Sequence, residues 1–350
     1  MSLEPLSDDV LRETVAVHAA NGGKVTKTAA HFGVRHSTIQ NRLEKARDKG
    51  FLLTATQAGP MIEMPSFVLD GDEEEPIEDI LARQRRAFER KQQAAAARKW
   101  FPIHVKEKKP YGILWFGDPH LDNSGCNWPL LEKHIAIAQQ DGVYGGNIGD
   151  TTDNWPWTGR LAKLWADSEV SSKTAKRMAE WFMFGAGVKW LVWLIGNHDA
   201  WNGGDEFYKK LGAYQVPVLD WRAQFRLVHN NGSEAKIDAA HGRKGNSIYN
   251  PAHGTLRDAK FGEEADLWVT GHIHSFKLDH FEIAERAHTT WLAQVRGYKW
   301  NDSFAWVNGF AEYQNGAAVL SIIDPETARI QCFADPEEGA RYLAWLRSKK

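Results

Sequence analysis

The sequence predicts an α/β protein in which two sheets pack together between outer helices, preceded by a small all-helical domain. Two observations lead to this prediction. From residue 110 onward, short apolar runs alternate with helical stretches, and the early strand–helix–strand order then gives way mostly to strands. Residues 1–55 instead carry apolar side chains at helical spacing, interrupted by glycine-containing turns.

The composition is typical of a soluble globular protein, with 43% hydrophobic and 25% charged residues in a chain of 350. The formal net charge of -2 excludes a uniformly basic nucleic-acid binder but not a local basic patch. The sequence has no apolar run of about 18 residues, as a membrane span requires, and its N-terminus lacks the apolar core of a signal peptide. Two cysteines fit a reducing compartment, so we expect a cytoplasmic protein without membrane contact.

The first domain is expected to contain three helices. Ser7, followed by two acidic residues, is typical of a helix start, and Asn21-Gly22-Gly23 ends that helix. A second helix is expected over residues 27–32. Gly33-Val34 then makes a tight turn before a third helix over residues 37–50.

The stretch TKTAAHFGVRHSTIQNRLEKA resembles the helix-turn-helix of bacterial and phage DNA-binding regulators. The resemblance implies that the start of the third helix reads the major groove of DNA. Small three-helix units also serve as protein–protein modules, and that alternative stays open. The side chains at this position that suit base edges and phosphates are Arg35, His36, Ser37, Thr38, Gln40, Asn41 and Arg42.

Residues 56–109 are expected to form a linker. Its first part carries prolines and an acidic run, which is typical of a loop or of disorder. A basic helix follows over residues 77–98, with Ile77, Leu81 and Phe88 on one face. Three roles for this helix are open: contact with nucleic acid, a solvated spacer, or pairing with a second copy of the chain in a homodimer.

The main domain is expected over residues 110–335, and residues 336–350 are expected to form a tail or a helix. Helices are predicted near residues 128–141, 169–184, 204–211 and 254–263. Strands are predicted at residues 113–116, 143–148, 190–195, 225–229, 235–239, 267–270, 276–282, 288–293, 317–323 and 330–333.

Polar motifs directly follow five of these strands. Active sites of open sheets gather in the loops at the carboxyl ends of strands, so we expect the five loops to converge on one rim. The glycines are expected to let the backbone turn sharply, and alternate ligands on an extended loop are expected to face the same side. The motifs are Gly117-Asp118-Pro119-His120, Gly149-Asp150, Gly196-Asn197-His198-Asp199, His241-Gly242 and Gly271-His272-Ile273-His274.

These motifs offer imidazole, carboxylate and amide ligands, a mixture that suits Mn²⁺, Zn²⁺, Fe²⁺ or Ni²⁺ and needs no thiol. A lone histidine is usually structural and a Gly-Asp pair is commonly a turn, so the signal lies in the ordered set. Two divalent ions about 3.5–4 Å apart can clamp a phosphoryl group and lower the pKa of the water between them. We therefore expect two divalent metal ions, with Mn²⁺ as the first choice.

The five motifs together resemble the calcineurin-like metallophosphoesterase superfamily over residues 113–323. The resemblance implies a four-layer α-β-β-α sandwich of two mixed sheets and the hydrolysis of phosphoesters. It also implies that His198 protonates the leaving oxygen or stabilises the developing charge, and that Asp199 orients His198. The metal ligands that it implies are Asp118, His120 and His274 for one ion, Asn197, His241 and His272 for the other, and Asp150 as the bridge.

Several neighbouring residues are further candidates. Asp153 is expected to anchor a ligand rather than to bind metal itself. Aromatic side chains at a rim can stack on bases, and we expect this of Trp155, Trp157 and Trp201. Each of the charged candidates has an ordinary surface role as its alternative. The other residues expected to contact substrate are Asn154, Arg160, Arg243, Lys244 and His253.

The motifs do not name the substrate, because phosphatases, nucleotidases, cyclic-nucleotide phosphodiesterases and DNA-repair exonucleases of this superfamily share them. The first domain favours DNA, and the main domain resembles, more loosely, the nuclease subunit of the bacterial and archaeal double-strand-break repair complex. A helix-turn-helix fused to a nuclease also fits a phage or mobile-element arrangement. The leading hypothesis is a Mn²⁺-dependent DNA nuclease. The alternatives are a small-molecule phosphoesterase with an N-terminal interaction module, and a DNA-binding regulator with an idle domain.

Overall fold

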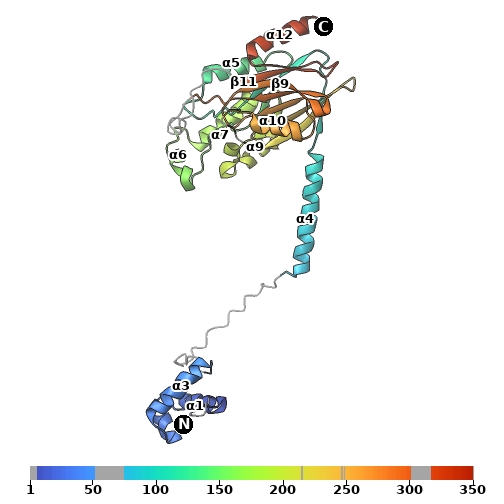
Figure 1. The fold of residues 1–350 in the computed structure, drawn as a ribbon. Helices are drawn as coiled ribbons and strands as arrows, with labels where there is room; N and C mark the ends of the chain where they lie inside the picture. The colour runs from blue at the N-terminus through green and yellow to red at the C-terminus, as the bar shows by residue number, and fades with distance from the viewer. Residues whose placement is uncertain are drawn as a thin grey trace. The chain divides into compact units, whose positions relative to one another are not determined.

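The fold is described from a computed structural model, which covers residues 6–51, 75–213, 216–245, 247, 249–300 and 317–349. The chain divides into two compact units, Met1–Pro76 and Ile77–Lys350, and each is described by itself (Figure 1). The proline-containing, acidic first part of the predicted linker lies almost entirely outside the described residues.

Residues 6–51 of the first unit contain three helices at the positions that the sequence predicts. Ser7 accepts a hydrogen bond from the main-chain nitrogen of Val10 and so caps the first helix. Gly33 ends the second helix with a φ of 64°, a left-handed conformation that suits glycine. Ile39 and Leu43 are buried in the small core of this unit. The helices are α1 (Asp8–Ala20), α2 (Val25–Phe32) and α3 (His36–Asp48).

The second unit begins with the predicted basic helix, α4 (Ile77–Ala97). No residue of α4 is buried along its fully described length. Ile77, Leu81 and Phe88 are exposed together with the rest of the helix, so their apolar face has no cover within the described part of this chain. Pairing of α4 with a second copy stays a prediction.

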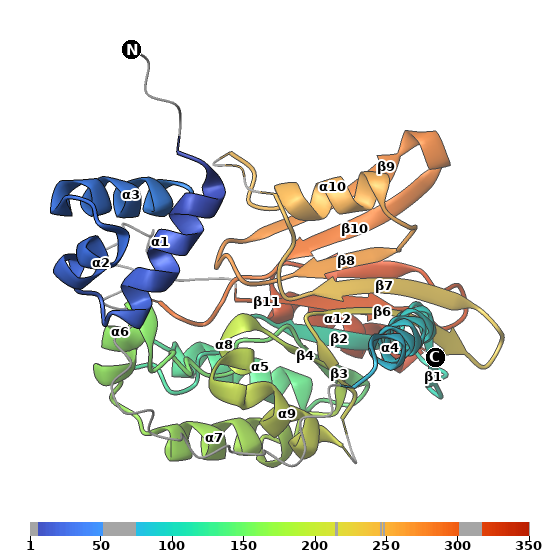
Figure 2. The same cartoon turned by 90° about the horizontal axis from the view of Figure 1, so that it is seen from below.

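Two six-stranded sheets form the body of the second unit (Figure 2). Both contain parallel and antiparallel neighbours, as expected of mixed sheets. One sheet has the order β1 (Phe101–Val105), β6 (Arg222–His229), β7 (Glu234–Ala240), β8 (Leu267–Thr270), β10 (His288–Gln294) and β9 (Lys277–Ile283). The other has the order β12 (Ile330–Phe333), β11 (Ala318–Ile323), β2 (Tyr111–Phe116), β3 (Val143–Asn147), β4 (Trp190–Ile195) and β5 (Val218–Asp220).

The sheets pack face to face through alternate side chains, as the two-residue period of a strand requires. On β2, Tyr111, Ile113 and Trp115 join the core between the sheets, which also includes Phe225 of the opposite sheet. The intervening Leu114 and Phe116 join a second core beneath the outer helices. Both faces of β2 are therefore buried, which explains its continuous apolar sequence.

Helices cover the outer faces of both sheets. Helix α10 lies against β8 and β10, whereas α5 and α12 lie against the sheet that contains β2 and β11 (Figure 2). Residues 336–349 thus form a packed helix rather than a tail. In the described part of this unit, the helices that follow α4 are α5 (Trp128–Ala138), η1 (Gly159–Leu161), α6 (Ala162–Ala166), α7 (Ser172–Glu180), η2 (Trp181–Gly185), α8 (Asn197–Ala200), η3 (Trp201–Gly203), α9 (Gly204–Gly212), α10 (His253–Phe261), η4 (Ala284–Arg286) and α12 (Pro336–Lys349).

The structure confirms every predicted strand, with ends shifted by a few residues, and adds two that the sequence did not reveal. Strand β1 lies within the stretch expected to be linker, yet it pairs in parallel with β6. It contains Pro102 and alternates between half-buried and exposed residues, which conceals an edge strand. The short β5 extends the other sheet beside β4. Within the described residues, no helix has the length and apolar character needed to cross a membrane.

Candidate metal centre

The five polar motifs follow β2, β3, β4, β7 and β8, and hydrogen bonds join their loops into one cluster. The main-chain nitrogen of His120 donates to the carbonyl oxygen of Asp150 at 3.1 Å. That of His198 donates to Oδ1 of Asp150 at 2.9 Å, and that of His272 donates to Oδ2 of Asp118 at 2.7 Å. The structure therefore brings the candidate ligands of both sheets together at one edge.

The centre of the cluster is Nε2 of His241. It lies 3.0 Å from Oδ1 of Asn197, 3.1 Å from Nδ1 of His272 and 3.2 Å from Oδ2 of Asp150. All four atoms can present lone pairs to the same small space. A proton on one histidine relieves only part of this repulsion, whereas a cation among the four atoms attracts all of them.

His241 is held in the orientation that this arrangement needs. Its Nδ1 lies 2.8 Å from the carbonyl oxygen of Ile148, to which it donates, so Nε2 carries the lone pair of the neutral ring. Burial alone would lower the pKa of His241, but the nearby carboxylate of Asp150 outweighs burial and raises the pKa to about 9. The site thus favours a positive charge at Nε2, and a divalent ion supplies one.

Asp118 marks the other half of the cluster. Its Oδ1 is buried and has no hydrogen-bond partner among the described residues, and burial raises the pKa of Asp118 to about 7. Nε2 of His274 lies 3.9 Å from Oδ2 of Asp118, and the rings of His120 and His274 are 5.2 Å apart. A buried carboxylate oxygen without a donor fits a metal ligand, because an ion compensates its lost hydration.

Asp153 lies against His120, in the place that the sequence predicts for an anchor, although Nδ1 of His120 has no well-aligned hydrogen bond among the described residues. Nδ1 of His120 lies 2.7 Å from Oδ1 of Asp153, which also pairs with the buried Lys299 at 2.9 Å. His120, Asp153 and His198 lie close enough to hold an ion themselves. However, the carboxylate of Asp153 also accepts hydrogen bonds from Asn123 and Trp155, so it is already occupied. We interpret Asp153 as an anchor that leaves Nε2 of His120 for the metal.

The backbone of the candidate ligands is not extended, contrary to the expectation from the sequence. Five of the seven ligands have a positive φ, which is uncommon and costly for residues with a Cβ. The side chains therefore converge through left-handed turns rather than through strand-like alternation. The values are 35° at Asp118, 44° at His120, 51° at Asp150, 71° at His272 and 48° at His274.

The motif glycines serve close packing more than turning. Gly149 is the exception, because its φ of 104° lies in a region that favours glycine. Gly196 has an ordinary extended backbone, with φ of -89°. A Cβ at Gly196 would overlap Oδ1 of Asp150 and would lie only 2.7 Å from its main-chain nitrogen. Glycine at this position lets the loop that carries Asn197 and His198 approach Asp150.

His198 lies beside the cluster, but Asp199 does not orient it as expected. The carboxylate of Asp199 accepts hydrogen bonds from the main-chain nitrogens of Thr151 at 2.9 Å and Gly196 at 3.0 Å. It thereby ties two motif loops together. Nδ1 of His198 instead donates to the carbonyl oxygen of Asp153, and its Nε2 lies 4.0 Å from Oδ2 of Asp150. Burial lowers the pKa of His198 to about 4.

Two expected stacking residues are used within the protein. Trp155 is buried, and its ring lies 4.6 Å from that of His198. Trp201 stacks on Trp155 and lies 4.2 Å from His198. Asn154, also expected at the substrate, donates to the carbonyl oxygens of His198 and Trp201. These three residues therefore position His198.

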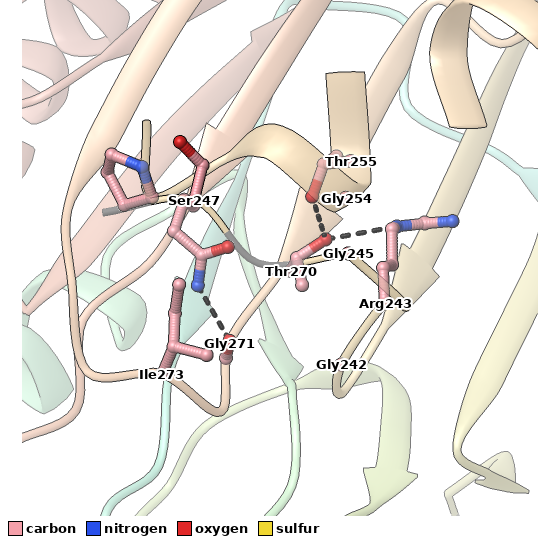
Figure 3. A pocket seen from close by; sticks show the side chains of 11 residues that line it. Gly242, Arg243, Gly245, Ser247, Gly254, Thr255, Thr270, Gly271 and Ile273 are labelled. Atoms are coloured by element: carbon pink, nitrogen blue, oxygen red, sulfur yellow. Dashed lines mark hydrogen bonds between the residues drawn. The ribbon is translucent and has the colours of Figure 1, made fainter. Parts of the chain in front are cut away.

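Arg243 also has a structural role rather than the expected substrate contact. Its side chain is 3% exposed and donates to Asp238, Asp258 and Thr270. Figure 3 shows the bond to Thr270 in the wall of a cavity of about 220 Å³, where Thr270 also contacts Thr255. The other charged candidates are solvent-exposed and keep their status as predictions; they are Arg160, Lys244 and His253.

Trp221 is a residue of the centre that sequence reasoning missed. Its ring lies 4.9 Å from His241 and 6.0 Å from His272, and its Nε1 donates to the carbonyl oxygen of Gly242 at 2.9 Å. It has a φ of 51° and remains 42% exposed. It lies between β5 and β6 outside every motif, so the sequence carries no signal for it.

Comparisons with known proteins add little to this geometry. No protein-family profile matches the chain, and no curated protein matches it. A protein of unknown function from Aquifex aeolicus is 17% identical over 47% of this chain and 80% of its own, with a TM-score of 0.27. A metallophosphoesterase from Sphaerobacter thermophilus is 13% identical over 67% of this chain and 94% of its own, also with a TM-score of 0.27. These TM-scores are too low for either likeness to bear on fold or function.

The geometry at His241 predicts that the purified chain retains divalent metal and that His241→Ala reduces the amount. The substitution removes the nitrogen at the centre of the converging ligands. Bound Mn²⁺ would be measured by inductively coupled plasma mass spectrometry after dialysis. His280→Ala is the matched control, because His280 is exposed and stacks on Trp291 away from the motifs. Equal metal content in the two variants would contradict a metal site at His241.

The burial of Arg243 predicts that Arg243→Met destabilises the protein. We expect a loss of about 3 kcal/mol in the free energy of unfolding, near the lower limit for a broken buried ion pair, because Arg222 still neutralises Asp238. Lys244→Met, at the exposed neighbouring position, should change stability by less than about 0.5 kcal/mol. Chemical denaturation measures both. If Arg243→Met left the free energy of unfolding unchanged but altered KM, the result would indicate that Arg243 contacts the substrate.

Proposed function

We propose that this chain is a metal-dependent phosphoesterase. The observation that supports this most strongly is the convergence of His241, Asn197, His272 and Asp150 on one point, with His198 alongside. Phosphoester hydrolysis needs a concentrated positive charge beside the phosphoryl oxygens and a group that serves the leaving oxygen. A cluster that attracts cations, next to a separate imidazole, meets both needs.

The residues fit two ions. Asp118, His120 and His274 would hold one, and Asn197, His241 and His272 the other, with Asp150 between them. When bound, two divalent ions supply Lewis-acid charge to the phosphoryl group and to its attacking water. The preference for Mn²⁺ rests on the imidazole, carboxylate and amide ligand set, and Zn²⁺, Fe²⁺ and Ni²⁺ suit the same set.

His198 would act on the leaving oxygen from its Nε2. Its Nδ1 proton is committed to the carbonyl oxygen of Asp153, so Nε2 donates only when the ring is protonated. Burial lowers the pKa of His198 to about 4, whereas an anionic phosphoester next to the ring would favour the protonated form. Trp155 and Trp201 pack on the ring and fix the direction of Nε2.

We further propose that the substrate is DNA, which makes the chain a nuclease. The first unit supports this proposal, because the start of α3 exposes Arg35, His36, Ser37, Gln40 and Asn41. Thr38 is half-buried, and Arg42 lies over the ring of Phe32 at 5.6 Å, so neither is as accessible as the sequence suggested. Small phosphoesters are the alternative substrates, with the first unit as an interaction module.

The position of His198 predicts that His198→Ala lowers kcat by about 10²–10⁴, the usual contribution of a general acid. The loss should appear with Mn²⁺ on linear DNA, whose alkoxide leaving oxygen needs a proton. Hydrolysis of bis-p-nitrophenyl phosphate should fall much less, because p-nitrophenolate leaves without a proton. Chelation should abolish both activities. The variant should retain its metal, because His198 is not among the ligands.

His280→Ala controls for the loss of a histidine elsewhere in the unit. A His198→Ala enzyme that hydrolyses DNA as fast as wild type would contradict the assigned role. A wild-type protein that hydrolyses bis-p-nitrophenyl phosphate but not DNA would contradict the nuclease proposal. It would still support the phosphoesterase proposal.

The exposed start of α3 predicts that Arg35→Ala combined with Gln40→Ala weakens DNA binding by about 1–3 kcal/mol for each base that is no longer hydrogen-bonded. Hydrolysis of bis-p-nitrophenyl phosphate should not change. Lys49→Ala is the control, because it removes one positive charge at the other end of α3, where Lys49 pairs with Asp8. Fluorescence anisotropy with labelled duplex DNA measures the affinity, and equal affinities of all three proteins would argue for a protein-binding module.

A further inference from the structure

A second, larger cavity of about 460 Å³ lies next to the centre, and no motif accounts for it. It lies between the loop that follows β3, the segment from α6 to α7, and α9. Its volume is in the range of sites that bind small molecules. Trp157, Trp165 and Phe207 contribute aromatic surface to its lining, and Thr152 and Tyr208 contribute hydroxyl groups.

The cavity shares residues with the centre. Asn154 and Trp155 line it, and both also contact His198. The Trp155 ring lies 4.6 Å from the His198 ring, and the Asn154 amide donates to the His198 carbonyl oxygen at 2.8 Å. A group bound in the cavity can therefore contact Trp155 and Asn154, which themselves contact His198.

Large aromatic side chains on this cavity are unusually accessible. Trp157 is 66% exposed and Trp165 is 46% exposed, although tryptophan gains most from burial. Exposed aromatic surface around a concave site is typical of ligand-binding surfaces. A ligand bound in this cavity would cover these two rings and remove their apolar surface from water.

The charged and hydrogen-bonding groups of the lining limit the chemical class of ligand that the cavity can bind. Among the lining residues, Asp122 is the one acidic side chain, and it accepts a hydrogen bond from the main chain of Asp153. Lys176 is the one basic side chain, and its Nζ lies 5.6 Å from the ring centre of Phe207. Ser168 and Ser172 add hydroxyls. Flat aromatic walls with scattered donors and acceptors suit a heteroaromatic ring that carries its own hydrogen-bonding edge.

We propose that this cavity binds the nucleobase of the nucleotide whose phosphoester lies at the metal centre. The inference rests on the proposed phosphoesterase function and names its substrate class as nucleotides or nucleic acid. The base lies against Trp157 and Trp165, with the sugar directed past Trp155 toward His198. Phosphoesters without a base gain nothing from these walls.

Two substrates with the same leaving group test the proposal: the p-nitrophenyl ester of thymidine monophosphate, and methyl p-nitrophenyl phosphate. Trp157→Ala and Trp165→Ala should each raise KM for the thymidine ester about tenfold, the usual effect of removing an aromatic ring that stacks on a base, with kcat nearly unchanged. KM for the methyl ester should stay within about twofold of wild type, because this ester carries no base. Trp345→Ala is the matched control, since Trp345 is 53% exposed on α12.

Titration calorimetry with thymidine monophosphate separates this inference from the proposed function. If the wild-type protein hydrolyses neither ester but binds the nucleotide more tightly than Trp157→Ala and Trp165→Ala do, the result supports the base site and contradicts the phosphoesterase proposal. If wild type hydrolyses both esters and both variants have the wild-type KM for each, the result contradicts the base site and supports the phosphoesterase proposal. Equal losses on the two esters would also overturn the base site. Thermal denaturation checks that each variant is folded.

Discussion

The arrangement around Nε2 of His241 is the constraint on which the rest of the second unit depends. Four lone-pair atoms from four different loops lie together there, an arrangement that repels unless a positive charge lies among them. The carbonyl of Ile148 fixes the histidine tautomer, and Asp150 raises its pKa. Two other features of the unit bring these atoms together. Five candidate ligands have a positive φ, and Gly196 leaves no room for a Cβ.

The sheet architecture makes that convergence possible. Parallel strands β2, β3 and β4 end at one edge, and so do the parallel strands β7 and β8 of the opposite sheet. Because both faces of β2 are buried, its carboxyl end has little freedom, and the loop from Gly117 to His120 starts from a fixed point. The rigid strands therefore fix where each loop that carries candidate ligands begins. The main-chain bonds between the loops of His120 and Asp150 then fix the rest.

The sequence predicts the strands and the motif set because both depend on the type and spacing of residues along the chain. It does not reveal what depends on backbone atoms: the carbonyl of Asp153 that orients His198 was missed, and Asp199 was given that role instead. It also fails for residues whose partners are brought within reach only by the fold, even when they are near in sequence. Arg243 suggested a phosphate contact, but Asp238 and Asp258 pair with it in the fold. Trp221 and the edge strand β1 lack any local pattern that would mark them.

The centre also concentrates unfavourable free energy in the folded chain. The left-handed backbone at the candidate ligands costs of order 1–3 kcal/mol per residue, and Oδ1 of the buried Asp118 loses hydration without a compensating donor among the described residues. The core between the sheets, with Trp115, Phe225 and their neighbours fully buried, must offset this cost. An ion that binds the folded cluster and not the unfolded chain adds a stability that rises with the logarithm of its affinity. Metal binding at this cluster, as proposed, would therefore be coupled to the stability of this unit.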